Sequence, residues 1–220
     1  VDYHANQLNV TYLNGKKQLM TVTFNVSNND VAFRYTFDKL KAQHLIVNEE
    51  KTAFNLPKVT TTYLCPQSDP LIGFARTKPS YEEDYKVDQP LSAKSGYGHG
   101  YTFPCLFKVG GDGWVLVSET GTHGNYPGCH ISDYDAAKGY QIAFPMKEEG
   151  DGIGSNNAVF SLPGSTPWRT ITVGKDLKPL VETTIPYDVV EPRYEASQKY
   201  GVGKYAWSWL IWQDGSCNYN

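Results

Sequence analysis

The sequence predicts an all-β domain: a large β-sandwich of about a dozen strands, with one short helix late in the chain. Three observations support this prediction. Apolar and polar residues alternate along several short segments, and glycine, asparagine and proline recur between these segments. Aromatic residues, which favour strands, make up 14% of the chain. Only residues 191–200 have helical character, with a proline at a position suited to a first turn.

The first three predicted strands form an antiparallel meander. They are separated by turns of a few residues, of which Asn14-Gly15 is the tightest. Within each strand the apolar side chains recur at every second position and therefore share one face. The predicted strands are residues 7–13, 19–26 and 31–37.

Later segments also have strand character: residues 44–48, 59–64, 114–117, 139–144, 157–162 and 169–173. Residues 80–88 are acidic, and we expect a solvated loop or a single helical turn there. The EF-hand spacing that would indicate a calcium loop is absent. The glycine-rich residues 96–103 lack the glycine order of a nucleotide-binding loop, so His99 is assigned to an exposed turn.

Composition excludes several classes of protein. The net charge of −3 gives no indication of a nucleic-acid partner, and no apolar run approaches the roughly 18 residues of a membrane span. The four cysteines contain no Cys-x-x-Cys pair, which argues against a zinc ribbon or a thioredoxin-type site. Disulfides stay open as an alternative whose pairing the sequence does not give, and we expect isolated buried thiols. The sequence opens at Val1 without a recognisable signal peptide, as a processed or trimmed chain would.

Glu119 is the leading candidate for a functional residue. It ends the apolar run that starts at Trp114, and the following residues, among them Gly121, Gly124 and Pro127, form loops. A carboxylate in this position either is a solvated strand-end residue or faces a ligand. The local sequence alone favours the solvated residue.

Four motifs in order resemble glycoside hydrolase family 97. Glu119 after its apolar strand is followed by Tyr126-Pro-Gly128, by Thr166-Pro-Trp-Arg169 and by Gly203-Lys-Tyr-Ala-Trp-Ser-Trp209. Val31-Ala-Phe-Arg-Tyr35 is also similar to an early strand of that family. The resemblance runs from about Leu19 to the last residue.

The resemblance implies a domain plan. Similar family members are α-glucosidases and α-galactosidases of Bacteroides-like bacteria, typically periplasmic. They join a super-β-sandwich of the galactose-mutarotase type to a (β/α)8 barrel and a small C-terminal β domain. On this plan residues 1–200 are the N-terminal super-β-sandwich, and residues 201–220 are a linker and the first strand of the truncated barrel, residues 205–212. Because both catalytic carboxylates come from the barrel, we expect this chain alone to be inactive.

The resemblance also implies roles for individual residues. Glu119 matches a glutamate that helps to hold calcium at the barrel's active site, with the other protein ligands supplied by the barrel. Trp209 matches a tryptophan that lines the sugar pocket, and Leu210 stands where a second tryptophan is common. Trp168 and Arg169 are expected to pack and to form ion pairs. The implied partners are the protein's own catalytic barrel and an α-linked glucoside or galactoside.

Two other classes of protein remain open at this point. A carbohydrate-binding sandwich without an attached enzyme would account for the many tyrosines and tryptophans, but not for a barrel-like strand at the end. A mutarotase-like sugar epimerase would need a histidine together with a carboxylate at an anomeric hydroxyl. His123 and His130 lie near Glu119 in the sequence and keep that alternative open.

Overall fold

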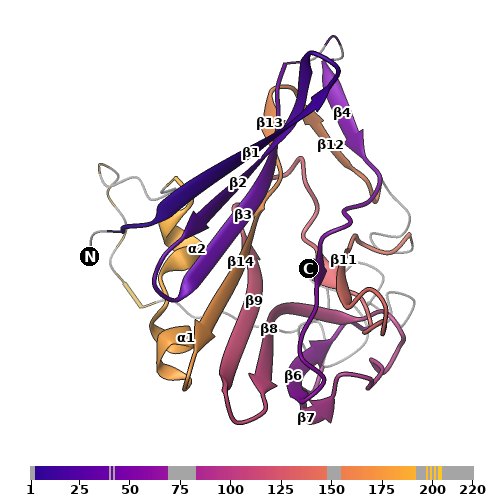
Figure 1. Ribbon diagram of the computed structural model, residues 1–220, viewed down its shortest axis with the longest axis vertical. Coiled ribbons are helices and arrows are strands. Elements are labelled where there is room, and N and C mark those ends of the chain that lie inside the picture. Colours follow the sequence, from indigo (N-terminus) through magenta and orange to yellow (C-terminus); the bar gives the residue numbers. More distant parts are fainter. Residues whose placement is uncertain are drawn as a thin grey trace.

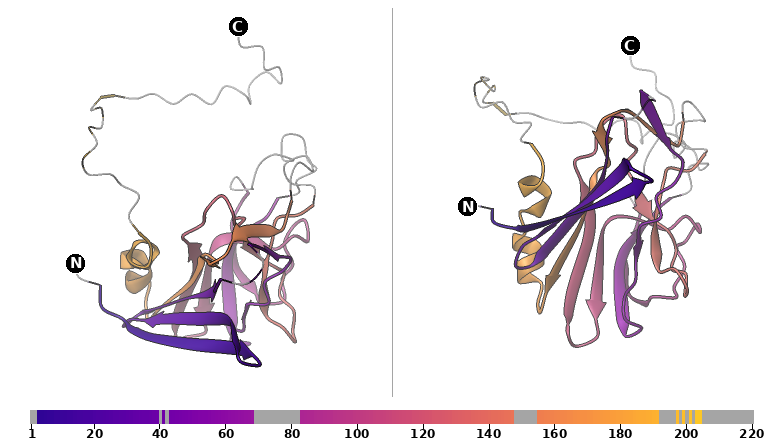
Figure 2. Two further views of the ribbon diagram at one scale, coloured as in Figure 1. Left: turned by 90° about the horizontal axis from the view of Figure 1, so that it is seen from above. Right: turned by 45° about the horizontal axis from the view of Figure 1, so that its top comes forward.

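The computed structural model of the 220-residue chain describes residues 3–39, 41, 43–68, 83–147, 155–191, 197, 199, 201, 203 and 204. These residues form a strongly twisted and curled antiparallel sheet with two short helices against one side (Figures 1 and 2). The predicted all-β sandwich class is therefore confirmed. The predicted barrel strand and Trp209 lie outside the described residues.

Fourteen strands and two helices are found in this part of the chain. The strands are β1 Asn6–Asn14, β2 Lys17–Val26, β3 Asp30–Phe37, β4 His44–Val47, β5 Ala53–Phe54, β6 Thr60–Pro66, β7 Lys86–Pro90, β8 Tyr101–Val109, β9 Gly113–Thr120, β10 His130–Ile131, β11 Tyr140–Ala143, β12 Ala158–Ser161, β13 Gly164–Ser165 and β14 Trp168–Gly174. The helices are α1 Lys178–Glu182 and α2 Ile185–Asp188.

Twelve of the strands belong to one sheet. Its main path runs β1-β2-β3-β14-β9-β8-β10-β11-β5, and β6 joins β8 with β7 outside it. The predicted meander is confirmed as β1, β2 and β3, and β14 then enters between β3 and β9. The strands β4 and β12 form a separate two-stranded sheet.

The two faces of the large sheet have different coverings. Cys105, Phe107 and Val117 point to one face, here called the inner face, and are fully buried in the main core. Residues of β5, β6, β10, β11 and β12 complete this core, because the curled sheet and the β4–β12 pair bring them over β8 and β9. The outer face carries a smaller cluster, in which Trp168 packs with Ile185 of α2.

Strand β8 is absent from the sequence prediction, and its residues explain why. Pro104 lies inside the run, and proline is normally excluded from central strands because it cannot donate to the ladder. In the structure Pro104 coincides with a shift in the β6–β8 register, between the pairs Tyr63↔Leu106 and Cys65↔Thr102. The β8–β9 pairing begins only at Cys105. The proline is tolerated because no ladder bond is needed from it at that irregularity.

Two further differences concern short elements. Residues 86–88, placed in the predicted acidic loop, belong to β7, which pairs only with the outer edge of β6 in the described part of the chain. The predicted helix at 191–200 lies mostly outside the described residues, and helical turns are found before it, in α1 and α2. These helices have five and four residues, which is too short to produce a recognisable helical period. Neither is long enough to cross a membrane.

Candidate functional site

Arg169 is the centre of a buried polar cluster on the inner face. It lies near the start of β14, where it pairs with Glu119 of β9 on one side and with Phe33 of β3 on the other. Because directly paired residues on neighbouring strands point to the same face, the sheet register brings the Arg169 and Glu119 side chains together. The Arg169 side chain is fully buried.

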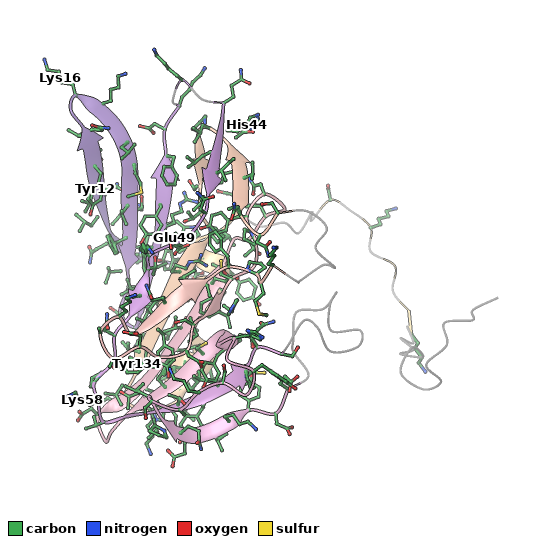
Figure 3. All side chains as sticks on the ribbon, turned by 90° about the vertical axis from the view of Figure 1, so that its right-hand side faces the viewer. Tyr12, Lys16, His44, Glu49, Lys58 and Tyr134 are labelled. Carbon is green, nitrogen blue, oxygen red and sulfur yellow. The ribbon has the colours of Figure 1, made fainter. Side chains whose placement is uncertain are left out.

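The guanidinium of Arg169 donates to two carboxylates. Its Nε lies 3.0 Å from Oε1 of Glu50 and its Nη2 lies 2.6 Å from Oε2 of the same residue, which is a bidentate pair. Its Nη1 donates to Oε2 of Glu119. Glu50 lies in the segment just before β5, so the cluster joins three parts of the chain that are far apart in sequence. Its neighbour Glu49, which is labelled in Figure 3, instead pairs with Lys51, and both side chains are exposed.

The loop after β9 closes the cluster. The hydroxyl of Tyr126 donates to Oε2 of Glu50 at 2.9 Å, and the backbone N–H of Cys129 donates to Oε1 of Glu119 at 2.9 Å. The guanidinium carbon lies 6.0 Å from the centre of the Tyr126 ring, and Nη2 lies 3.4 Å from the Cys129 sulfur. Tyr126 and Cys129 are themselves buried. Residues 126–129 thus fix both carboxylates in place.

The two carboxylates are not equivalent. Burial raises the pKa of each, but the hydrogen bonds and the charge of Arg169 outweigh burial at Glu50 and leave its pKa below the ordinary value. At Glu119 burial prevails over Arg169 and the Cys129 N–H, so the pKa of Glu119 is raised. Arg169 keeps its charge: burial lowers its pKa, but the bonds and charge of Glu50 raise it further. One cation therefore faces two carboxylates, and Glu119 is the less compensated of the two.

Glu119 retains capacity for another ligand. A carboxylate offers about four lone-pair positions, and the two hydrogen bonds described above occupy one on each oxygen. The Glu119 side chain is 11% exposed, against 5% for Glu50 and 0% for Arg169. Among the described residues, no three His, Cys, Asp or Glu side chains gather closely enough to hold a metal ion. Glu119 is thus suited to contribute one carboxylate to a cation whose other ligands come from elsewhere.

The outcomes for the candidate residues differ. The local interpretation of Glu119 as a solvated strand end is wrong, because the side chain is buried in an ion pair. The packing role of Trp168 and the ion-pairing role of Arg169 are confirmed. The calcium role of Glu119 stays a prediction. Cys65, Cys105 and Cys129 are free buried thiols as expected, and Cys217 lies outside the described residues.

The histidines do not favour the epimerase alternative. His130 is buried in β10, and burial lowers its pKa to about 4, so the ring stays neutral and shielded from solvent. His123 is exposed in the loop after β9. An epimerase needs a histidine that reaches its substrate, and His130, which directly follows Cys129 of the buried cluster, is enclosed in the core.

Sequence reasoning missed Glu50 and the use of Tyr126. The Tyr126-Pro-Gly128 motif marked the loop but not its hydrogen bond to a residue 76 positions earlier. Glu50 follows Glu49, and alternation does not distinguish which of two adjacent acids turns inward. The usable signal was Arg169 itself, since a buried arginine on a core face requires a carboxylate partner.

The curled antiparallel sheet defines the class of the domain as an all-β sandwich, and comparison with known proteins makes the class specific. A family model described as Glycosyl-hydrolase 97 N-terminal matches residues 1–192. The chain belongs to glycoside hydrolase family 97, as the N-terminal domain of such an enzyme. The match begins at the first residue, earlier than the resemblance from about Leu19 indicated.

Solved structures agree with this assignment. The β-arabinopyranosidase of one crystal structure shares 55% sequence identity with this chain, and the two structures superpose with a TM-score of 0.88. The match covers 98% of this chain and 34% of that one. A family 97 enzyme from Pseudoalteromonas sp. strain K8 in complex with panose is 20% identical, with a TM-score of 0.61, covering 86% of this chain and 30% of that one. The same values hold for its complex with acarbose, and both show the fold alone. This chain thus spans about a third of the length of these enzymes, and no curated protein matches it.

Proposed function

We propose that this chain is the N-terminal domain of a glycosidase that acts on β-L-arabinopyranosides or α-D-galactopyranosides. The observation that carries the proposal is the 55% identity, over nearly the whole chain, to a β-arabinopyranosidase. The ring of a β-L-arabinopyranoside has the configuration of an α-D-galactopyranoside without its hydroxymethyl group. The α-galactoside of the sequence prediction is therefore close in shape to the substrate class of the related enzyme, whereas an α-glucoside differs at the C4 hydroxyl.

Within this enzyme we assign to Glu119 the role of a calcium ligand. Arg169 and the Cys129 N–H hold its two oxygens in fixed positions, and Glu50 balances most of the charge of Arg169. The raised pKa of Glu119 supports the assignment, because a buried and incompletely balanced carboxylate gains from a neighbouring cation. When bound, calcium would supply positive charge beside the reaction centre.

The catalytic carboxylates belong to the part of the enzyme outside this domain. We propose that this part is a barrel on which the domain packs, and that residues 205–212, including Trp209 as a wall of the sugar pocket, begin it. The periplasmic location rests on the resemblance alone. The two carboxylates of a glycosidase flank the bond that is cleaved, and the domain's contribution is to hold Glu119 in place beside them.

Substrate preference tests the proposed class. The complete enzyme is expected to hydrolyse aryl β-L-arabinopyranosides and α-D-galactopyranosides with kcat/KM at least about tenfold above that for the matching α-D-glucopyranoside. A site that hydrogen-bonds one epimer leaves buried polar groups without partners when the other epimer binds. Initial rates with the three p-nitrophenyl glycosides measure the ratio. A preference for the glucoside would contradict the proposal.

Replacement of Glu119 tests its metal role. In the complete enzyme, Glu119→Gln is expected to weaken calcium binding by at least about tenfold and to lower activity, with partial rescue by excess calcium. The amide keeps the shape and one acceptor oxygen but loses the charge that a hard cation prefers. Calorimetric titration of chelator-treated enzyme measures the affinity.

Glu49→Gln is the control, because Glu49 is the exposed neighbour of Glu50 and pairs locally with Lys51. Unchanged calcium affinity and activity in Glu119→Gln would remove the residue from the metal site.

A further inference from the structure

The hairpin of β1 and β2 has one apolar and one polar face. Six residues, which pair directly across the two strands, form what is here called the hairpin patch: Leu8, Val10 and Tyr12 of β1 with Phe24, Val22 and Met20 of β2. The patch lies on the inner face, because Phe24 pairs with Phe33 and Val22 with Tyr35 of β3. This face is the one that carries the main core farther along the sheet.

The patch is only partly covered. Val22 is buried near β3, but Leu8 is 58% and Tyr12 is 51% exposed at the sheet edge. Figures 1 and 2 show β1 at that edge, with β2 between it and β3, and Figure 3 labels Tyr12 on the hairpin below Lys16 at its tip. In the described part of the chain, nothing packs over the outer half of this apolar face.

The opposite face of the hairpin is polar and faces solvent. It carries polar side chains that hydrogen-bond across the strands: Gln7 to Asn25 at 3.0 Å, Thr23 to Asn9 at 2.8 Å and Thr11 with Thr21 at 3.3 Å. Alternation of this kind is the pattern of a sheet with one covered and one solvated face. The exposed Leu8 and Tyr12 depart from this pattern, because they leave apolar side chains open on the face that should be covered.

The hairpin patch and the buried carboxylates lie in one row of the sheet. The direct pairs run Leu8↔Phe24, Phe24↔Phe33, Phe33↔Arg169 and Arg169↔Glu119, all on the inner face. Four strand spacings separate the ends of this row, which is about 19 Å. At β14 and β9 this face is covered by the core and by the loop at Tyr126, so the hairpin patch is the part of the row that stays open to a partner.

We propose that the hairpin patch is the docking surface for the catalytic region of the same polypeptide. This inference rests on the proposed function. The related β-arabinopyranosidase is about three times as long as this chain, so a body large enough to cover the patch belongs to an enzyme of this kind. The patch is apolar and carries no charged side chain, which suits a permanent contact within one polypeptide.

The size of the patch favours an intramolecular partner over a second copy of the chain. The six residues of the patch, on two neighbouring strands, span roughly 200 Å². A stable interface between separate proteins buries about 800 Å² on each partner. A tethered partner needs less contact area, because its effective concentration is already in the millimolar range.

Hydroxyl-radical footprinting of the complete enzyme tests the contact directly. Tyr12 is compared with Tyr85 and Tyr97, which are 57% and 40% exposed and have the same intrinsic reactivity. Tyr12 is expected to be oxidised at least about fivefold more slowly than both. Equal rates would overturn the proposal. Protection that disappears on dilution, together with a fall in the sedimentation coefficient, would identify a second copy as the occupant and would overturn it as well.

A pair of lysine variants tests docking at the hairpin patch independently. Tyr12→Lys places a charge on the patch, whereas Thr11→Lys places the same charge on the adjacent solvent face of the same strand. Tyr12→Lys is expected to lower the Tm of the complete enzyme by about 3–6 °C and Thr11→Lys by under about 1 °C. Equal shifts would contradict docking. Neither measurement depends on calcium, so an exposed Tyr12 beside an impaired Glu119→Gln enzyme would refute only the docking, and the reverse pattern would refute only the metal role.

Discussion

Replacement of Arg169 by methionine is expected to destabilise the sheet around β9 and β14 by about 3–5 kcal/mol. Methionine fills much of the volume of the arginine but provides no donor, so Glu50 and Glu119 are left buried without their shared cation. The cost of an unbalanced buried carboxylate is larger than that of a lost surface pair. Hydrogen exchange of the β9 and β14 amides in the complete enzyme measures the effect, as a rise in exchange rate of about a hundredfold or more.

Arg34→Met is the matched control for this experiment. Arg34 lies on β3 and stacks on the outer-face residue Trp168, with its guanidinium carbon 4.4 Å from the ring centre. Because that contact is a single cation–π pair, its loss is expected to cost about 0.5–1 kcal/mol. Similar exchange rates in the two variants would show that the guanidinium of Arg169 is not what stabilises the buried carboxylates.

A second substitution separates the charge from the packing. In Arg169→Met with Glu50→Leu, one of the two stranded carboxylates is also removed. Replacement of a buried ion pair by apolar residues of similar size is often neutral, whereas removal of one partner is not. The double variant is therefore expected to recover part of the lost protection. No recovery would indicate that the shape of the arginine, and not its charge, is what the cluster requires.

The site could be predicted from sequence only as far as its strand positions allow. Glu119 follows a predicted strand that is a short apolar run, and Arg169 begins a predicted strand that alternates. Their meeting follows from the β9–β14 register. Glu50 and Tyr126 come from irregular segments, whose paths depend on how the whole sheet curls. Their hydrogen bond joins positions 76 residues apart, and no periodicity encodes such a contact.

The strands also divide into those that their local sequence predicts and those that it does not. Val31, Phe33, Tyr35 and Phe37 alternate regularly, and β3 was predicted within one residue of its observed start. Strand β8 was missed because Pro104 is unfavourable for a central strand by local rules, and only the register shift of β6 against β8 makes it acceptable. The hairpin of β1 and β2 was predicted as a strand pair with one apolar face, but alternation alone does not reveal that this face remains open.

The free energy of unfolding of the domain is expected to fall by about 3 kcal/mol between pH 6.5 and pH 4 because of His130. Burial lowers the pKa of His130 to about 4, against 6.5 for an ordinary histidine, while a hydrogen bond with the His99 backbone opposes the shift. Between these two values the unfolded chain binds a proton that the folded domain excludes. The stability contribution is thus complete above pH 6.5 and is lost as the pH falls toward 4.

Comparison of variants isolates this contribution from the carboxylates. The raised pKa of Glu119 acts with the opposite sign, since it favours the folded state as the pH falls toward 4.5, and the lowered pKa of Glu50 removes stability only below its ordinary value. His130→Gln eliminates the titrating ring but leaves both carboxylates, so its stability should change less between pH 7 and pH 4.5 than that of the unmodified enzyme. Hydrogen exchange of the β8 and β10 amides, corrected for the intrinsic pH dependence, measures the difference.

The control is His44→Gln, at an exposed position of β4, which should keep the full pH dependence. If His130→Gln and His44→Gln lose protection equally on acidification, the histidine is not buried as a neutral ring, and the objection to its participation in epimerase chemistry no longer holds.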